Sequence, residues 1–188
     1  MSLPTENTIV VSPLVDLETE LLDNICRSIH LAFRYKIEIT PLLGELDFAF
    51  DSDRSQYHST AILEKLASLA PPHAVKVLAI TKEDLFIPIM SYVYGEAQLG
   101  GKACIISINR LKENPSLLNN PDFYQDRLVK ESIHELGHTF SLRHCRDQVC
   151  IMHYSRTVRD VDKKANTFCR YCSVLLEDEL KGLKESHP

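Results

Sequence analysis

The chain has 188 residues, which leaves room for one large domain or for a domain with a small appended lobe. Its hydrophobic share of 44% and charged share of 25% are ordinary for a soluble globular protein, and no apolar run approaches the roughly 20 residues of a membrane-spanning helix. The net charge of −5 argues against a nucleic-acid-binding protein, because binding to phosphates depends on clustered lysines and arginines. The first residues lack the basic start and apolar centre of a secretory signal, so we expect a cytoplasmic protein.

Strands and helices are predicted to alternate in the first part of the chain, which is typical of an α/β domain. Runs rich in β-branched residues predict strands at residues 7–14, 35–40 and 75–81. Apolar residues at helical spacing predict helices at residues 16–33 and 60–70. Asp16 is the expected N-cap of the first helix, and two prolines end the second. A polar stretch at residues 47–59 is expected to cross the surface before the second helix.

The next segment, residues 88–111, predicts two strands joined near Gly100 and Gly101, a hairpin that can form a sheet edge. Pro121 is expected to open a long helix that ends near residue 140. Cysteines and loops then dominate until a terminal helix at residues 173–183. We therefore predict an N-terminal α/β subdomain at residues 1–140 and a C-terminal subdomain at residues 141–188.

The long helix ends in the sequence "HELGH", residues 134–138. His134 and His138 lie one helical turn apart on one face, so both imidazoles can bind a single ion, and Glu135 can reach a water on that ion. This is the H-E-x-x-H arrangement, in which zinc lowers the pKa of the bound water to about 7 and the glutamate takes its proton.

His144 can supply a third imidazole only if the helix ends sharply after Phe140. Helix ends of this kind prefer glycine in the left-handed conformation, whereas this chain has Ser141. A residue other than glycine costs about 1 to 2 kcal/mol in that conformation. The turn is therefore expected to be strained or to take another shape.

Four of the six cysteines fall in two short pairs after the histidines. They are Cys145, Cys150, Cys169 and Cys172. Pairs spaced in this way match a closed tetrahedral zinc site of four thiolates. The absence of a signal argues against disulfides and polar neighbours argue against core packing, while an iron–sulfur cluster stays open as an alternative. Cys26 and Cys104 lie in apolar surroundings and are expected to be core residues.

The stretch "HELGHTFSLRHCRDQVCIM", together with the later "CRYC", resembles the archaemetzincins, a family of the metzincin clan of zinc metallopeptidases. The resemblance implies a metzincin-like zincin fold of class α/β. Its features would be a twisted, mostly parallel mixed sheet of about five strands with an antiparallel edge strand, an active-site helix and a small zinc-stapled C-terminal subdomain. It also implies two zinc ions per chain, a catalytic zinc on His134, His138 and His144 and a structural zinc on the four cysteines.

The resemblance implies roles for further residues. Glu135 would be the general base, and Met152 would be the methionine of the tight turn beneath the catalytic zinc. Tyr154 is a candidate oxyanion stabiliser, since some metzincins have a tyrosine there. The substrate would lie along an edge strand, for which "SYVYGEA", residues 91–97, is the candidate. The glycine that metzincins commonly have between the second and third histidines is replaced by Ser141.

The function expected from these features is hydrolysis of peptide bonds in a peptide or protein substrate by a monomeric zinc metallopeptidase. One alternative is a zinc-stabilised binding or scaffold protein whose metal site is inactive or regulated. A second alternative is an H-E-x-x-H enzyme whose third ligand is Glu177 or Glu179 of the last helix instead of His144.

Overall fold

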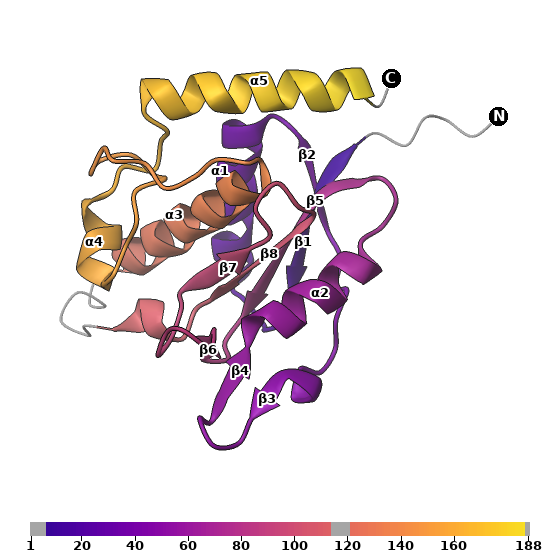
Figure 1. Cartoon of the computed structure of the whole chain (residues 1–188), viewed down its shortest axis with the longest axis vertical. Coiled ribbons are helices and arrows are strands. Elements are labelled where there is room, and N and C mark those ends of the chain that lie inside the picture. Colours follow the sequence, from indigo (N-terminus) through magenta and orange to yellow (C-terminus); the bar gives the residue numbers. More distant parts are fainter. Residues whose placement is uncertain (1–6, 114–120, 187–188) are drawn as a thin grey trace.

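The molecule is built around a five-stranded sheet with the strand order β2-β1-β5-β8-β7 (Figure 1). The computed structural model describes residues 7–113 and 121–186. The strands are β1 Thr8–Pro13, β2 Lys36–Ile39, β5 Ala74–Thr81, β7 Gly95–Ala97 and β8 Ala103–Ser107. Neighbouring strands run parallel except β7, which pairs with β8 in the antiparallel direction at one end of the sheet. The predicted mostly parallel sheet with an antiparallel edge strand is confirmed.

Helices cover both faces of this sheet (Figure 1). They are α1 Thr19–Phe33 and α3 Pro121–Thr139 on one face and α2 Ser59–Leu69 on the other. Successive residues of a strand point to opposite faces, so Ile9 and Val11 of β1 join the core under α1 and α3, whereas Val10 joins the core under α2. Because both faces are covered, the central strands are continuous apolar runs.

Helix α1 has the predicted apolar face but begins later than expected. Its buried residues are Leu21, Ile25, Ile29 and Phe33. The preceding residues are not helical, and Val15 and Leu17 pack there against the same core as the helix. The helix therefore starts at Thr19 with Glu18 in the N-cap position, and the prediction of Asp16 as N-cap is wrong.

A second, smaller sheet has the strand order β3-β4-β6. Its strands are β3 Phe50–Asp51, β4 Gln56–His58 and β6 Leu85–Phe86. Two of them lie in the polar stretch at residues 47–59, and they are too short to produce an alternating pattern in the sequence. The buried side chain of Gln56 donates hydrogen bonds of 2.9 Å to the Asp84 carboxylate and the Ser91 carbonyl, which ties this sheet to the chain that leads into β7.

After α3 the chain folds back over α1 and α3 (Figure 1). This last part of the chain contains α4 Val158–Lys163 and α5 Arg170–Ser186. Earlier in the chain there are two 3₁₀ turns, η1 Asp47–Ala49 and η2 Arg110–Lys112. A capping box between Thr157 and Asp160 begins α4. Leu142, Met152 and Leu176 are buried in the core that α1 and α3 share, so apolar contacts hold this last part of the chain against them.

A buried lysine joins β5 to the end of α3. Lys76 is 6% exposed, and its Nζ donates hydrogen bonds to the carbonyl oxygens of Thr139 at 2.6 Å and Gly101 at 2.7 Å. The Nζ also lies 5.0 Å from the centre of the Phe140 ring. A cation at this position satisfies a carbonyl that the helix leaves unpaired and interacts favourably with the helix dipole.

We expect Lys76→Met to lower the free energy of unfolding by about 2 to 4 kcal/mol, because it removes the Nζ donor from the buried Thr139 carbonyl and from the partly buried Gly101 carbonyl. Denaturant unfolding followed by circular dichroism measures the change. Lys65→Met is the matched control, since Lys65 is an exposed lysine of α2 and should change stability little.

The same pair of variants gives a test at alkaline pH. Burial, and secondarily Lys102, lowers the pKa of Lys76 from 10.5 to about 8. The unfolded chain keeps this proton to about pH 10, so the Lys76 contribution to stability rises between about pH 8 and pH 10. The stability difference between wild type and Lys76→Met should grow over that range. This account of Lys76 would be contradicted if the stability difference between wild type and Lys76→Met did not change with pH. It would also be contradicted if Lys76→Met and Lys65→Met lost the same amount of stability.

Candidate metal centre

His134 and His138 present two nitrogen lone pairs to one point. Each Nδ1 faces a backbone carbonyl oxygen, that of Ile151 at 2.8 Å and that of Leu142 at 2.7 Å. A carbonyl only accepts, so both Nδ1 atoms carry the hydrogen and both Nε2 atoms are left as acceptors. These two Nε2 atoms lie 3.2 Å apart. Two ligands at about 2.0 Å from a tetrahedral zinc would be about 3.3 Å apart, so the pair fits a metal ion and not a hydrogen bond.

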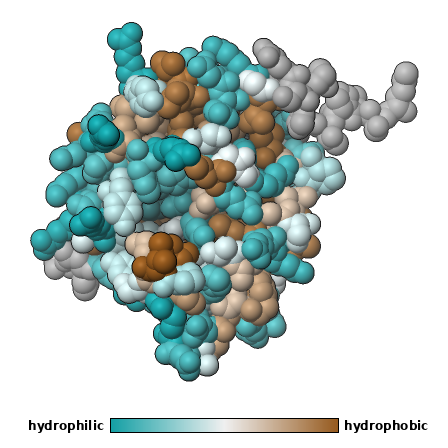
Figure 2. All heavy atoms as spheres, viewed as in Figure 1, coloured by the Kyte–Doolittle hydropathy of each residue, from teal (hydrophilic) through white to brown (hydrophobic). Residues whose placement is uncertain are grey.

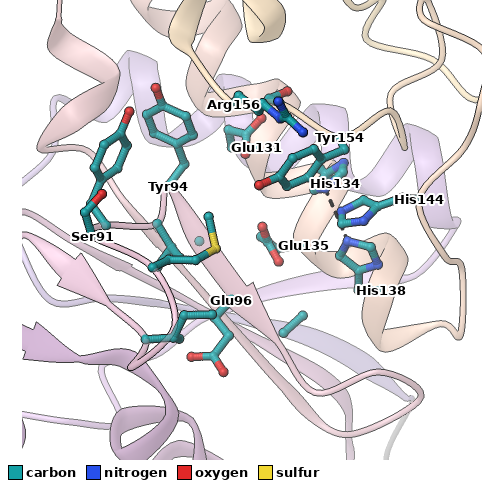
Figure 3. Close-up of a pocket in the computed structure, with 17 residues that line it drawn as sticks. Ser91, Tyr94, Glu96, Glu131, His134, Glu135, His138, His144, Tyr154 and Arg156 are labelled. Carbon is teal, nitrogen blue, oxygen red and sulfur yellow. Dashed lines mark hydrogen bonds between the residues drawn. The ribbon is translucent and has the colours of Figure 1, made fainter.

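His144 completes the group from the chain beyond the helix (Figure 3). Its ring centre lies 5.4 Å from that of His134 and 4.8 Å from that of His138, and the three ligand atoms all lie within 4.8 Å of one another. Burial lowers the pKa of His144 to about 4 and lowers the pKa values of the other two imidazoles as well. All three are therefore neutral at pH 7, the form that binds metals. Among the described residues, neither Glu177 nor Glu179 belongs to this group.

The turn that brings His144 back has the shape of a glycine-type helix end without the glycine. Ser141 has a φ of 64°, and its N–H donates to the His138 carbonyl at 3.0 Å. The N–H of Leu142 donates to the Gly137 carbonyl at 3.1 Å, which completes a Schellman motif. Gly100 donates a second hydrogen bond to the His138 carbonyl at 2.9 Å. These bonds offset the cost of the left-handed serine, so the turn that the sequence made uncertain is formed.

Two glycines that no motif singled out bring the site together. A Cβ on Gly137 would lie 2.5 Å from the Met152 sulfur, and a Cβ on Gly95 would lie 2.7 Å from Cγ of Glu135. Gly137 therefore allows Met152 to pack directly beneath the histidine turn of α3, and Gly95 allows Glu135 to lie against β7. The signal for Gly137 was present in the sequence, since a glycine inside a helix costs about 1 kcal/mol relative to alanine and needs a packing reason.

Glu135 lies in a dense arrangement of buried charge. Its side chain is 6% exposed, and burial followed by repulsion from Glu131 raises its pKa well above the usual value. Glu131, one turn earlier on α3, accepts a hydrogen bond of 3.0 Å from Lys164, and both of these side chains are buried. A glutamate with a raised pKa next to a metal site has the properties of an acid–base group.

The four cysteines form a second group of ligand atoms, all within 4.8 Å of one another. They are free thiols, and the Sγ atoms of Cys145 and Cys169 lie 3.8 Å apart. Sulfur ligands at about 2.3 Å from a tetrahedral zinc would be about 3.8 Å apart, so the geometry fits a four-thiolate site and excludes disulfides. The other two cysteines are outside this group, as expected: Cys104 is fully buried in the core and Cys26 packs partly against it.

A cleft of about 500 Å³ opens from the histidines along the edge of the sheet (Figure 3). Its walls are Ile87 and residues 90–97, the face of α3 that carries His134 and His138, His144, and residues 154–156. The predicted edge strand is therefore in place, although regular pairing with β8 is limited to Gly95–Ala97. In the loop between β6 and β7, which supplies part of this wall, Ile89 is 89% exposed, and hydrophobic side chains gather over that loop (Figure 2).

We expect Gly137→Ala to destabilise the protein by about 1 to 3 kcal/mol, because the added methyl group overlaps a methionine sulfur that is itself fully buried. Thermal or denaturant unfolding measures the change. In the double variant with Met152→Ala, part of the overlap is removed, so the two effects should be less than additive.

Gly182→Ala is the matched control for this change. Gly182 also lies in a helix, α5, but a Cβ there would meet nothing within 4 Å. Alanine should stabilise that helix by up to about 1 kcal/mol. Stabilisation by both alanines would show that Met152 does not need the space at Gly137.

Comparison with known proteins gives a consistent result over almost the whole chain. The family model "Peptidase family M54" matches residues 7–178. The curated archaemetzincin of Methanopyrus kandleri is 35% identical over 158 residues, which cover 79% of this chain and 87% of the relative. That of Archaeoglobus fulgidus is 34% identical over 165 residues, which cover 88% and 96%.

Solved structures agree with these sequence matches. The crystal structure of the M. kandleri archaemetzincin is similar with a TM-score of 0.83 and 30% identity, and the match covers 95% of this chain and 97% of that one. The structure of the A. fulgidus archaemetzincin, complexed with malonate, matches with a TM-score of 0.75 and 32% identity over 89% of this chain and 99% of that one. The fold, the two ligand groups and these comparisons together show that the chain belongs to Peptidase family M54, the archaemetzincins, and is a zinc metallopeptidase.

Proposed function

We propose that the protein hydrolyses peptide bonds at the centre formed by His134, His138 and His144, with Glu135 as the general base. The observation that carries this proposal is the pair of opposed Nε2 lone pairs 3.2 Å apart, with a buried carboxylate next to them at the head of a cleft. Zinc bound there would polarise the scissile carbonyl and lower the pKa of a water ligand to about 7. Side chains of the protein would transfer the proton and stabilise the oxyanion.

Glu135 is suited to move a proton between the water and the leaving amine. Its raised pKa brings its proton affinity closer to that of an activated water than an exposed glutamate would have. The carboxylate lies against Gly95 of β7, so a peptide along that strand would have its reacting bond close to the carboxylate. Glu135 would accept the proton of the water and later donate it to the amine.

Tyr154 and Met152 would support the reaction from the other wall. The Tyr154 ring packs against His144, with ring centres 5.0 Å apart, and its hydroxyl points into the cleft (Figure 3). A phenol there could donate a hydrogen bond to the oxyanion as the carbonyl becomes tetrahedral. Met152 would support the histidines through its contact with Gly137 and would not bind the metal.

We propose that the substrate is an extended peptide or protein segment that adds to the free edge of β7. In the described part of the chain, β7 pairs with β8 alone, which leaves its outer backbone groups available to a new strand. In the described residues no helix has the length and apolar character that crossing a membrane requires. A cytoplasmic location, a monomeric state and the absence of nucleic-acid partners stay predictions.

A second, structural zinc is proposed for the four cysteines, which makes two ions per chain. The N–H of Cys145 donates a hydrogen bond to the Met152 carbonyl at 2.8 Å. The residue before Met152, Ile151, has the carbonyl that orients the His134 ring. An ion on the cysteines would therefore hold the segment that carries the supports of the histidine site. We propose the division into subdomains at residue 140 for the same reason, since all four cysteines of this site lie after that residue.

Zinc content tests the two-site proposal. Purified wild-type protein should contain about two zinc ions per chain, and the double variant His134→Ala/His138→Ala about one, by metal analysis. Cys169→Ser/Cys172→Ser should lose the structural ion and lower the unfolding temperature. One ion in the wild type that disappears only with the cysteines would favour a zinc-stabilised binding protein with an empty histidine site.

The role of Glu135 is tested by Glu135→Gln. We expect kcat on a cleavable peptide to fall about 10²- to 10⁴-fold, because the amide cannot accept the proton of the water. Zinc content should stay unchanged, since Glu135 is not among the ligand atoms. Glu177→Gln, an exposed change on α5, is the control. Full activity of Glu135→Gln would show that another group is the base.

A further inference from the structure

The cleft wall contains an arginine whose guanidinium forms no ion pair with the described residues. Among the described residues that line the cleft, Arg156 is the one with an arginine or lysine side chain. The carboxylates of the lining belong to Glu96, Glu131 and Glu135. In the described part of the chain, the Arg156 guanidinium takes part in none of the ion pairs. An exposed arginine at the wall of a substrate cleft is available to a ligand group.

The carboxylates close to Arg156 already have partners. Asp160, outside the cleft lining, accepts hydrogen bonds from the backbone N–H groups of Arg156 and Thr157 and forms an ion pair with Lys163. Glu131 lies at the same end of the cleft as Arg156 (Figure 3), and its Oε1 receives a hydrogen bond from Lys164. The side chains of Glu131 and Lys164 are 4% and 0% exposed, so this ion pair is a neutral unit in the cleft wall. Of the three charged side chains Arg156, Glu131 and Lys164, Arg156 is the one without an ion-pair partner in the described residues.

The other two carboxylates lie elsewhere in the cleft. Glu96 of β7 accepts hydrogen bonds from the hydroxyl groups of Thr60, at 2.8 Å, and Ser59 at the start of α2. In Figure 3 its carboxylate points away from Arg156, and Glu135 lies between the two. Glu135 belongs to the reacting centre next to the histidines. Neither carboxylate therefore forms an ion pair with Arg156.

A second polar group, next to Arg156 in the sequence, has no hydrogen-bond partner among the residues that the structure describes. The Oγ atom of Ser155 is buried, and it has no hydrogen-bond partner in the described residues, although Ser155 also lines the cleft. A guanidinium offers planar N–H donors and a serine hydroxyl offers one O–H donor, and both kinds of donor bind carboxylates. Tyr154, the residue before this pair, packs on His144, so the two donors lie close along the chain to the metal centre.

We propose that Arg156 and Ser155 form a carboxylate-binding subsite, so that the enzyme prefers peptides with a carboxylate one or a few residues from the cleaved bond. This inference rests on the proposed peptidase function and adds a substrate class to it. The carboxylate belongs either to an aspartate or glutamate side chain or to the free C-terminus of a short peptide. Arg156 is thus a specificity-determining residue.

The test measures kcat/KM of the zinc-loaded full chain on internally quenched peptides in which each position is in turn Glu, Gln or Lys. At one position we expect Glu to be preferred over the isosteric Gln by about tenfold. A parallel set of peptides with a free or amidated C-terminus distinguishes the two sources of the carboxylate. The preference should decrease with salt, because Arg156 is exposed to solvent.

Variants connect the preference to the residue. Arg156→Gln should abolish the preference and Arg156→Glu should reverse it in favour of Lys, with cleavage of the Gln peptides largely retained. Arg159→Glu is the matched control, since Arg159 is exposed on α4 and does not line the cleft. Equal preferences in wild type and Arg156→Gln would overturn the subsite, whereas no cleavage of any peptide by wild type would overturn the peptidase proposal itself.

Discussion

The structure of the metal centre depends on the abrupt end of α3. His144 reaches the other two imidazoles because the chain reverses at Ser141, immediately after the helix. A helix that ends inside the protein must find protein donors for its last carbonyl groups, because water cannot reach them. The Schellman bonds provide some of these donors, and the others come from distant segments, Lys76 of β5 and Gly100 of the β7–β8 turn. The sheet therefore determines where the helix ends, and the helix end determines where the third imidazole lies.

Charge as well as apolar packing attaches the last part of the chain to α3. Arg127 of α3 is 1% exposed and makes a two-point ion pair with Asp162, with N···O distances of 2.7 and 2.8 Å. Two residues later in the chain, Lys164 pairs with Glu131. A buried charge left alone costs several kcal/mol, so these pairs strongly disfavour separation of residues 162–164 from α3. These ion pairs also help to hold in place residues 154–156, which line the cleft and come just before α4 in the chain.

The sequence predicted what short-range spacing can encode and missed what depends on distant contacts. The one-turn spacing of His134 and His138 and the two cysteine pairs carried the metal groups, because ligands at fixed steps on a helix or a tight loop need no tertiary information. In contrast, nothing near Lys76 in the sequence indicates that its partners are the carbonyls of Thr139 and Gly101. Helix α3 was found through its motif and its proline, since residues 127–137 are buried on all sides of the helix and leave no apolar stripe of the kind that marks most helices.

The adjacency of His144 and Cys145 has an energetic consequence for the proposed pair of zinc ions. The chain from Ser141 to Ile151 has no helix or strand, so ordering it costs roughly 1 to 2 kcal/mol per residue in backbone entropy. An ion on the four cysteines would offset that cost, because binding free energy at a structural site is folding free energy. The segment that carries His144 would then already be ordered when its imidazole binds the ion of the histidine site. On this proposal the histidine site would depend on the cysteine site, whereas the cysteine site, with Cys172 on α5, would not need the histidines.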